Sequence, residues 1–348
     1  MSQAPTNPYQ PYAAAHKDTK GPGDSRPTAL QIIKDNEAAG KLKGKTILVT
    51  GCSSGIGIET ARALYETGAQ LFLTARDIPK LNGIIDDIVT KATIKDAPRP
   101  EVLELHLDSL ESVRKGAEEF KKRSSQLNIL ICNAAVMACP YSTTKDGFEL
   151  QIGTNHFAHF LLFQLLKPLL LESAQQSGMS SRVIAVSSAG HRMSPVLLDD
   201  INFSNGATYQ KWKSYGQSKT ANIYMASSIE RHYGNQNLHA LSLHPGVIKT
   251  DLSRHLVPED LQGMNLDQIR HLYKNPEQGA ATTVWAATSP HFEAANGGRY
   301  LAECGECGPV AKDSAMGADG YAEHVYNPEA EEKLWKLSYE AVGLPVED

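Results

Sequence analysis

The sequence has few cysteines, few aromatic residues and no long uninterrupted apolar run. Five cysteines, an odd number in a chain of 348 residues, are too few for a disulfide scaffold and are typical of a reducing compartment. The most apolar stretch, residues 160–171, contains Gln164, Lys167 and Pro168 and is shorter than the roughly 18–20 residues of a membrane span. We therefore expect no membrane span, no secretory leader and a cytoplasmic location.

The sequence also lacks a strong excess of charge of either sign. Its 34 basic and 39 acidic side chains give a net charge of −5, which offers no electrostatic footprint for nucleic acid or for an anionic membrane. Hydrophobic residues make up 41% of the chain, too large a share for a disordered protein. No internal repeat is present. These properties predict a folded globular protein whose partner is a small molecule.

The chain divides into three parts. Residues 1–27 are rich in Pro, Gly, Gln and Ala and are expected to form a loosely ordered tail. Thr28 and Gln31 have the spacing of a capping box and Gly40 stands where a helix would stop, so residues 28–43 are predicted to be a lead-in helix. The third part, residues 44–345, is predicted to be a single α/β domain.

Within that domain, short β-branched runs alternate with segments of helical length. The runs lie at residues 46–50, 70–75, 102–108, 127–133, 182–188, 238–244 and 299–302. Strands that alternate with helices are joined by right-handed crossovers and lie parallel in one sheet. The pattern therefore predicts a doubly wound sheet of seven parallel strands.

A glycine-rich turn, TGCSSGIG at residues 50–57, follows the first predicted strand and precedes a helical pattern. Glycines at such a turn let the backbone approach a pyrophosphate, whose charge is stabilised by the amides and dipole of the helix N-terminus. The turn predicts a dinucleotide site, with an ordinary βα turn as the alternative. Its proposed cofactor contacts are Gly51, Ser53, Ser54, Gly55, Ile56 and Gly57. The segment GKLKGKT at 40–46 does not fit a P-loop, because its glycine spacing is short and it precedes its strand.

The end of the second predicted strand indicates which dinucleotide is bound. A carboxylate there would bind the adenosine ribose 2′-hydroxyl, but this chain has Ala75 followed by Arg76. A guanidinium can instead make charge-assisted bonds to a 2′-phosphate, which favours NADP(H) over NAD. Asp77 follows directly, and the alternative is that Arg76 is a solvated loop charge.

The spacing Tyr-x-x-x-Lys occurs three times in the sequence. Two of the pairs lie in loop-like segments and are interpreted as accidental: Tyr141/Lys145 and Tyr209/Lys213. Tyr215/Lys219 opens a helical pattern, so an ammonium would lie one turn from a phenol. Together with the positive nicotinamide of an oxidised cofactor, Lys219 would lower the pKa of Tyr215. Such a phenol can donate a proton to the alkoxide that forms when a carbonyl is reduced. Ser188, at the end of the fifth predicted strand, would hydrogen-bond the substrate oxygen.

Taken together, these motifs resemble the short-chain dehydrogenase/reductases, in particular the branch of retinol dehydrogenases and WW-domain-containing oxidoreductase. The resemblance covers residues 44–345 and rests on TGCSSGIG at 50–57, CNAAVM at 132–137, TNHFAHF at 154–160, VSSAGH at 186–191, YGQSK at 215–219, HPGVIKT at 244–250 and GRYLAECG at 298–305. It implies a Rossmann-type fold and NADP(H)-dependent interconversion of a carbonyl and an alcohol. The catalytic residues that it implies are Asn155, Ser188, Tyr215 and Lys219, with Asn155 kinking its helix and holding a water in a proton relay through Lys219.

The resemblance also implies cofactor contacts beyond the glycine turn, at the adenine for Asp108 and at the carboxamide for residues 245–250. These contacts are Arg76, Asp108, Asn133, Ala134, Tyr215, Lys219, Pro245, Gly246, Val247 and Thr250. The chain departs from the family pattern at Ala135, where glycine is expected, and at Ser54, where many NADP users have a basic residue. Pairing through the long helices after the fourth and fifth strands would give a homodimer or homotetramer.

Residues 250–275 are expected to form a lid over the substrate. Apolar residues recur there at Leu261, Met264, Leu266, Ile269 and Tyr273. An apolar lid would indicate a lipophilic or specialised-metabolite ketone or aldehyde as the substrate, and the alternative is a helix that merely covers the sheet.

Other chemically notable residues carry weaker signals. Cys304 and Cys307 form C-x-x-C without a second pair, so no metal site is expected. His156 and His159 are interpreted as packing or surface residues. His191, three residues after Ser188, could either reach the substrate or anchor its loop.

Two rival functions stay open at this stage. One is a non-catalytic interaction protein that responds to NADP, against which stands the presence of all four catalytic positions. The other is a non-redox reaction in the same site, such as isomerisation or cyclisation.

Overall fold

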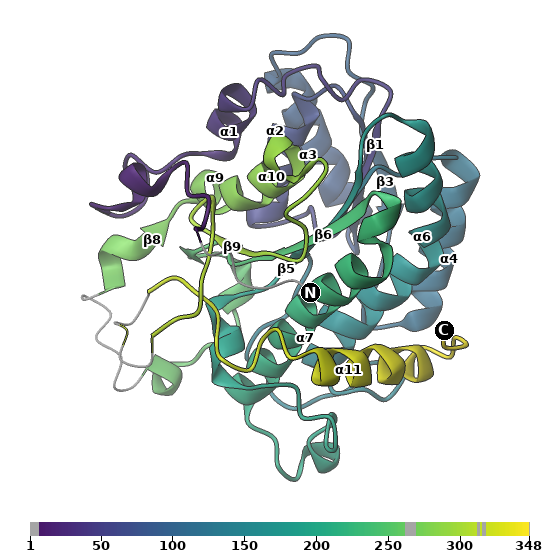
Figure 1. Ribbon diagram of the computed structural model, residues 1–348, viewed down its shortest axis with the longest axis vertical. Coiled ribbons are helices and arrows are strands. Elements are labelled where there is room, and N and C mark those ends of the chain that lie inside the picture. The colour runs from purple at the N-terminus through teal and green to yellow at the C-terminus, as the bar shows by residue number, and fades with distance from the viewer. Residues whose placement is uncertain (1–6, 262–268, 312–313, 315–317, 348) are drawn as a thin grey trace.

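A computed structural model describes residues 7–261, 269–311, 314 and 318–347, and an eight-stranded sheet lies at its centre (Figure 1). The strand order is β10-β9-β6-β5-β4-β1-β2-β3. The bounds are β1 Thr46–Val49, β2 Gln70–Ala75, β3 Glu101–Glu104, β4 Ile129–Cys132, β5 Ser181–Val186, β6 Leu238–Leu243, β9 Tyr300–Ala302 and β10 Gly305–Glu306. The predicted doubly wound sheet of seven parallel strands is confirmed. The eighth strand, β10, runs antiparallel to β9 at the edge and is too short to leave a sequence signal.

The sheet is buried on both faces because helices cover each of them (Figure 1). Successive strand side chains point to opposite faces, so Leu48 joins one apolar core while Ile47 and Val49 join the other. This double burial explains why the strands are continuously apolar. The first core is shared with α4 Leu110–Arg123, α6 Ala158–Gln176, α7 Lys211–Tyr233 and α11 Pro328–Ala341. The second is shared with α1 Ala29–Asp35, α2 Ile56–Tyr65, α3 Ile78–Lys91 and α10 Ala281–Thr288.

The order of the strands reverses between β1 and β4, which are hydrogen-bonded neighbours in the sheet. The chain winds outward from β1 to β3, returns to β4 beside β1, and then winds outward in the opposite direction. In open α/β sheets, the crevice at the carboxyl ends of the strands at such a reversal is the usual ligand site. The predicted glycine turn follows β1, so the fold places it at this reversal.

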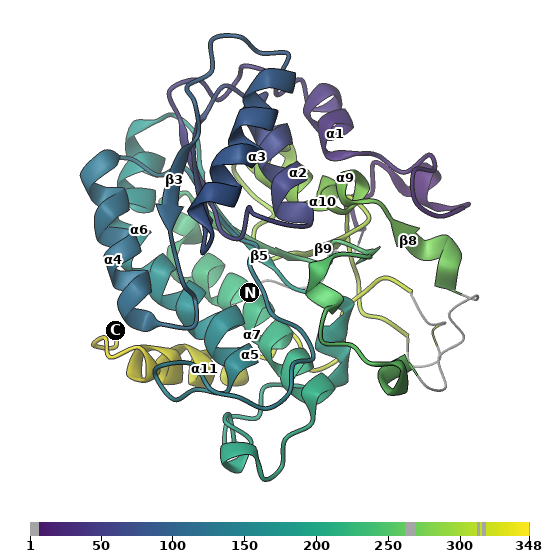
Figure 2. The same cartoon turned by 180° about the vertical axis from the view of Figure 1, so that it is seen from behind.

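Residues 7–27 are packed on the domain, whereas we expected a loosely ordered tail. Opposite views show this segment beside α9 Pro276–Gly279 and β8 Tyr273–Lys274 (Figures 1 and 2). The prediction was wrong because it considered only apolar burial, and the segment is held mainly by polar contacts such as those of the buried Arg26. The lead-in helix follows as α1, with Thr28 as its N-cap, but it ends at Asp35, before Gly40.

The helix after β4 is interrupted in a way that bears on the site. Three helical stretches run continuously as α5 Leu150–Ile152, a π-helical turn at Gly153–Phe157 and α6. Together they are long and apolar enough to cross a membrane, but 72% of the apolar window is buried inside the molecule, which is typical of a core helix.

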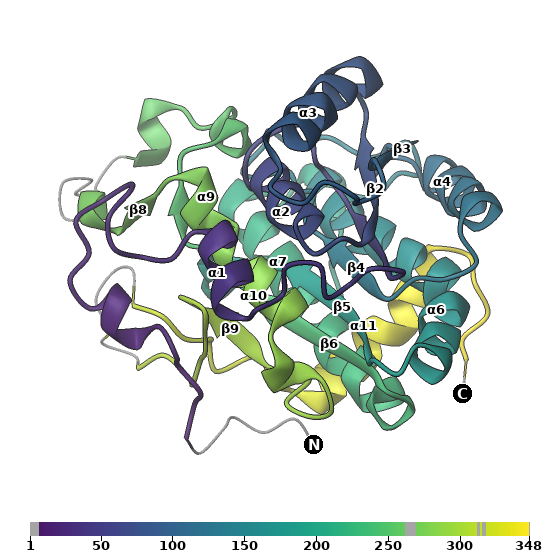
Figure 3. The same cartoon turned by 90° about the horizontal axis from the view of Figure 1, so that it is seen from above.

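The predicted lid is described only in part, because Met264 and Leu266 lie outside the described residues. Its described portions include β7 Val247–Ile248 and β8, which pair in parallel as a separate two-stranded sheet. Viewed from above, α9 and β8 lie beside the N-terminal segment (Figure 3). Ile269 and Tyr273 are half-buried there.

Candidate functional site

The glycine turn between β1 and α2 is built so that side chains would not fit. Gly51 and Gly55 have φ of +74° and +59°, a region that favours glycine. A Cβ on Gly57 would lie 2.1 Å from the carbonyl oxygen of Gly51. The N-cap of α2, Gly55, has no side chain to cap the helix, so the first amides of α2 are left without a side-chain acceptor. Ser53, Ser54 and Ile56 line the same turn and are half-buried.

A buried polar network joins the glycine turn to the loop after β4. The Thr50 hydroxyl accepts hydrogen bonds from the amides of Asn133 and Ala134, at 2.9 and 3.0 Å. The Asn133 side-chain amide donates to the carbonyls of Thr50 and Gly51. Both predicted cofactor segments therefore share one rigid edge.

His159 extends this network to Asn155. Burial lowers the pKa of His159 to about 4, so the ring is neutral and has one N–H. Nδ1 lies 3.0 Å from the Asn155 carbonyl oxygen, which can only accept, so Nδ1 carries the hydrogen. Nε2 then accepts from the Thr50 hydroxyl, 2.9 Å away. The sequence had suggested only packing or a surface position for His159, and neither His159 nor Thr50 was among the predicted site residues.

Asn155 lies inside the π-helical turn, as the expected kink requires. Its Oδ1 accepts from the Val136 amide, and its Nδ2 donates to the Val136 carbonyl and to Ser218 Oγ, each at 2.9 Å. Ser218 Oγ in turn donates to the carbonyl of Tyr215. The Asn155 side chain thus fixes the loop after β4 to the start of α7.

The predicted residues Ser188, Tyr215 and Lys219 come together at the carboxyl end of β5. Lys219 Nζ lies 5.7 Å from the centroid of the Tyr215 ring and donates to the Val186 carbonyl at 3.0 Å. Ser188 lies beside the Tyr215 ring, since a Cβ on Gly190 would lie 3.3 Å from Ser188 Oγ and 2.7 Å from that ring. The fold therefore brings these three predicted residues, from the end of β5 and from α7, into one group.

Burial controls the protonation of this group. Burial lowers the pKa of Lys219 to about 7, because the charged ammonium is poorly solvated there. Burial also raises the pKa of Tyr215 to about 12, against a smaller lowering by Ser188. These directions describe the protein by itself, where desolvation of the phenolate dominates, and the lowering expected from Lys219 together with an oxidised nicotinamide stays a prediction.

Gly190, which the sequence did not single out, and His191 position the Ser188 loop. A Cβ on Gly190 would lie 2.7 Å from the Tyr215 ring, so glycine is required for that ring to lie where it does. His191 Nε2 accepts from the Ala322 amide, so its Nδ1 carries the hydrogen and donates to the Ser188 carbonyl at 2.6 Å. Burial lowers the pKa of His191 to about 3. Of the two roles considered for His191, this geometry favours loop anchoring.

The segment 245–250 lies across from the glycine turn. A Cβ on Gly55 would lie 3.4 Å from the Thr250 side chain, so the two predicted cofactor segments meet at this point. Val247 begins β7, and Pro245 and Gly246 are half-buried just before it.

The residues at the adenosine end fit a dinucleotide. Buried oxygens of Asp108 (Oδ1) and Asn133 (Oδ1) have no hydrogen-bond partner among the described residues, which suits donors supplied by a bound nucleotide. Arg76 is exposed at the end of β2. The neighbouring Asp77 carboxylate caps α3, accepting from the Lys80 amide at 2.9 Å, and is therefore engaged away from a ribose. These unpartnered acceptor oxygens and the glycine turn thus fit a nicotinamide dinucleotide.

The cysteines offer no comparable site. All five are buried and free, and the Cys304 thiol lies 3.7 Å from the Thr282 hydroxyl. Within the described ranges, no group of three or more His, Cys, Asp or Glu side chains is arranged to hold a metal ion.

We predict that Gly57→Ala destabilises the protein by about 1–3 kcal/mol and abolishes nucleotide binding, because its methyl group would overlap the Gly51 carbonyl. Urea unfolding and nucleotide titration would measure both effects. Gly83→Ala, in the exposed face of α3 with open space around it, is the matched control and should be neutral or stabilising by about 0.5–1 kcal/mol. Equal behaviour of the two variants would contradict the prediction.

We predict that Lys219→Met raises the melting temperature at pH 6 by about 2–4 °C. Below pH 7 the folded protein must keep the buried ammonium charged, and this penalty is relieved as the pH rises from about 7 towards 10.5, the ordinary pKa of lysine. The Val186 carbonyl keeps a second donor, the Asn222 amide, in the variant. Thermal melts at pH 6 and pH 9.5 should show a gain that shrinks at the higher pH, and a gain that is independent of pH would refute this account.

Comparison with known proteins agrees with the fold and the motifs. The pattern of the family described as short chain dehydrogenase matches residues 45–198. Short-chain dehydrogenase/reductase prx1 of Penicillium roqueforti is 46% identical over 334 residues, which cover 96% of this chain and 95% of that protein. Retinol dehydrogenase 14 of Homo sapiens is 34% identical over 328 residues, covering 90% and 91% of the two chains. A crystal structure of a Mycobacterium paratuberculosis protein is 30% identical with a TM-score of 0.65, covering 89% of this chain and 98% of that chain. The chain belongs to the short-chain dehydrogenase/reductase family, and its similarity extends to the branch with the retinol dehydrogenases.

Proposed function

We propose that this protein is an NADP(H)-dependent oxidoreductase that interconverts a carbonyl and an alcohol, with Tyr215 as its acid and base. The observation that carries the proposal is the buried Lys219 ammonium 5.7 Å from the centroid of the Tyr215 ring, with Ser188 beside the same ring. A buried cation next to a phenol is costly to fold and has a clear chemical use, the stabilisation of a phenolate.

The proposed mechanism assigns a separate task to each side chain. When bound, a nicotinamide would supply or accept hydride at the substrate carbon. The Ser188 hydroxyl would hold the substrate oxygen, and Tyr215, protonated at neutral pH, would donate its proton to the developing alkoxide. Lys219 would stabilise the resulting phenolate. Asn155 would order the relay that returns the proton, through its main-chain carbonyl and the π-helical turn.

Tyr215 is protonated at neutral pH in the protein by itself and can donate its proton during the reduction of a carbonyl. The reverse reaction requires the phenolate and therefore becomes easier as the pH rises. Because reduction consumes a proton, low pH favours reduction and high pH favours oxidation of the alcohol.

The preference for NADP(H) rests on Arg76 and Asp77. Arg76 is exposed where a 2′-phosphate would lie, and the carboxylate that could otherwise bind a ribose hydroxyl is engaged as the cap of α3. Ser54 does not supply a second basic side chain, so the preference depends on a single guanidinium.

A lipophilic ketone or aldehyde, including one of specialised metabolism, is the proposed substrate class. The human relative is named for retinol, a lipophilic alcohol, and the half-buried Ile269 and Tyr273 give the described part of the expected lid an apolar character. Cytoplasmic location stays a prediction. So does pairing through α6 and α7, where α11 lies across both helices and would form part of any such interface.

The rival functions differ from this proposal in what the protein does with carbonyl compounds. A non-catalytic interaction protein would bind NADP(H) but turn over no member of a broad carbonyl panel. A non-redox enzyme would convert substrate without net oxidation of NADPH. Absorbance at the nicotinamide band identifies the oxidoreductase, because neither rival oxidises NADPH. Chromatography of the carbonyl compound separates the two rivals, since only the non-redox enzyme converts it.

We predict that Tyr215→Phe lowers the rate of carbonyl reduction by about 10²–10⁴ while NADPH binding is retained, because only the proton donor is removed. Stopped-flow and steady-state NADPH oxidation would measure the loss. Tyr141→Phe removes the hydroxyl of one of the pairs interpreted as accidental and should leave the rate within about twofold. A Tyr215→Phe protein with full turnover would overturn the assignment.

We predict that Arg76→Ala weakens NADPH binding by about 10–100-fold and changes NADH binding by less than about threefold, since only the 2′-phosphate loses a partner. Calorimetric titration of both nucleotides would test this. Lys80→Ala, which removes an exposed charge one turn further along α3, is the control for a general loss of positive charge. Equal weakening of both nucleotides would show that Arg76 does not select between them.

A further inference from the structure

The side chain of Lys274 packs against the loop at residues 245–248. Gly246 has φ of +106°, and a Cβ there would lie 2.8 Å from Lys274 Cδ, so the lysine side chain packs directly against the loop. Lys274 Nζ lies 3.4 Å from the Pro245 carbonyl oxygen and 2.8 Å from a Glu303 carboxylate oxygen. Val247 pairs with Tyr273 in the β7–β8 sheet. Whatever fixes β8 therefore also fixes this loop.

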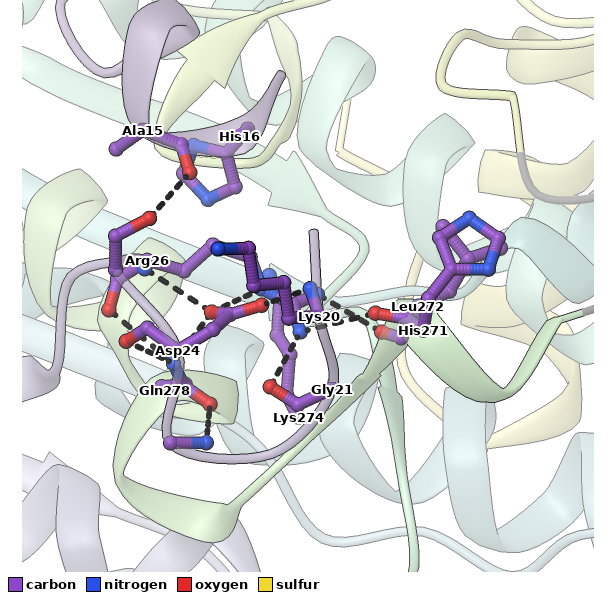
Figure 4. Close-up of polar contacts among 12 residues, drawn as sticks. Ala15, His16, Lys20, Gly21, Asp24, Arg26, His271, Leu272, Lys274 and Gln278 are labelled. Carbon is purple, nitrogen blue, oxygen red and sulfur yellow. Dashed lines mark hydrogen bonds and ion pairs between the residues drawn. The ribbon is translucent and has the colours of Figure 1, made fainter. Parts of the chain in front are cut away.

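Arg26 fixes β8. Its guanidinium is almost fully buried and donates to the carbonyls of Leu272 at 2.9 Å and Tyr273 at 2.6 Å, with a longer contact of 3.4 Å to the His271 carbonyl (Figure 4). Three successive carbonyls thus face one guanidinium. The planar fork of arginine can match such an arrangement, whereas a lysine ammonium cannot.

The guanidinium is itself held in place by its own segment. Asp24 Oδ1 accepts from Arg26 Nε at 2.8 Å, and the Gly21 carbonyl accepts from Nη2. The side chain of Gln278 on α9 accepts from the Gly23 amide and donates to Asp24 and to the Arg26 carbonyl (Figure 4). Both charges of the buried Asp24–Arg26 pair are compensated, so the contact is rigid.

A second contact ties the same segment to Lys274. His16 Nε2 lies 2.8 Å from one oxygen of Glu303, whose other oxygen binds Lys274. These partners lower the pKa of Glu303 to about 2 despite its burial, so it carries a negative charge at neutral pH. On the far side, a Cβ on Gly279 of α9 would lie 2.6 Å from Ile248 and 2.8 Å from Ile56 of the glycine turn. The segment therefore reaches the loop 245–250 from two sides, through β8 and through the contact of α9 with Ile248.

We propose that residues 16–26 form a strap that positions the loop 245–250 for the nicotinamide half of the cofactor, and that Arg26 is its main positioning residue. The proposal rests on the proposed function and assigns the strap to the nicotinamide end alone. Arg26 touches no reacting group. It acts by reducing the number of conformations that the loop samples before the cofactor binds, which lowers the cost of ordering that loop on binding.

The test compares two ligands that share the adenosine half. NADPH carries the nicotinamide, whereas adenosine 2′,5′-bisphosphate lacks it. We expect Arg26→Gln to weaken NADPH binding about tenfold and to leave adenosine 2′,5′-bisphosphate within about twofold. Arg182→Gln is the matched control, because Arg182 is a buried guanidinium on the carbonyls of Ala286 and Ala287, away from the glycine turn. It should lower the melting temperature without changing the ratio of the two affinities.

Arg26→Lys provides a second variant if Arg26→Gln does not fold. It keeps a positive charge beside Asp24 but cannot reach all three carbonyls, and we expect about a threefold loss confined to NADPH. Hydrogen exchange of the amides at 247–248 and 273–274 should be faster in Arg26→Lys than in the wild type.

The outcomes distinguish failure of the strap proposal from failure of the proposed function. Equal weakening of both ligands, or no change for either, in a folded Arg26 variant would overturn the strap proposal while leaving the proposed function intact. A wild-type protein that binds adenosine 2′,5′-bisphosphate and NADPH equally well would also overturn it, since no nicotinamide contact would then exist to position. Failure of the wild type to bind either ligand would overturn the proposed function itself.

Discussion

The burial of the Lys219 ammonium is the constraint to which the rest of the site conforms. A charge with so little access to water costs free energy to fold, and the protein compensates with a single strong acceptor, the Val186 carbonyl at the end of β5. That acceptor fixes Lys219 relative to the sheet, and the helical spacing then fixes Tyr215 relative to Lys219. Ser187 Oγ donates to the Lys219 carbonyl, which adds a second hydrogen bond between the end of β5 and α7 at Lys219. The reactive group is thereby held by the sheet rather than by a loop.

Neutral buried histidines connect this junction to its surroundings. His159 joins Thr50 to the carbonyl of Asn155, and His191 joins the Ser188 loop to Ala322. In both rings burial keeps the pKa low, so each has one donor and one acceptor in a fixed order. Each histidine thus makes hydrogen bonds whose direction does not change near neutral pH.

The sequence was most informative where periodicity and motif agreed. The strand over 70–75 was predicted with its observed bounds. The glycine turn and Ser188 lie at strand ends, because parallel strands bring their carboxyl ends to one edge, and Tyr215 and Lys219 lie on the predicted helix, α7. Long-range polar contacts were not predictable in this way. Neither the contacts of Arg26 with the carbonyls of residues 271–273 nor the hydrogen bond that the Ala322 amide donates to His191 leaves a periodic signal. The pKa of Tyr215 in the protein by itself also required burial to be known, since spacing alone says nothing of desolvation.

The cap at the start of α3 has a consequence for how nucleotide preference could change. The Asp77 carboxylate stabilises the first turn of that helix, so recruiting it to bind a ribose would unravel a helix end. Replacing Arg76 by a neutral residue would weaken the binding of NADP(H) without adding a group that binds the ribose hydroxyls of NAD(H). A switch of preference from NADP(H) to NAD(H) would therefore need a new acidic residue at position 75 or 76, with Asp77 retained as the cap of α3.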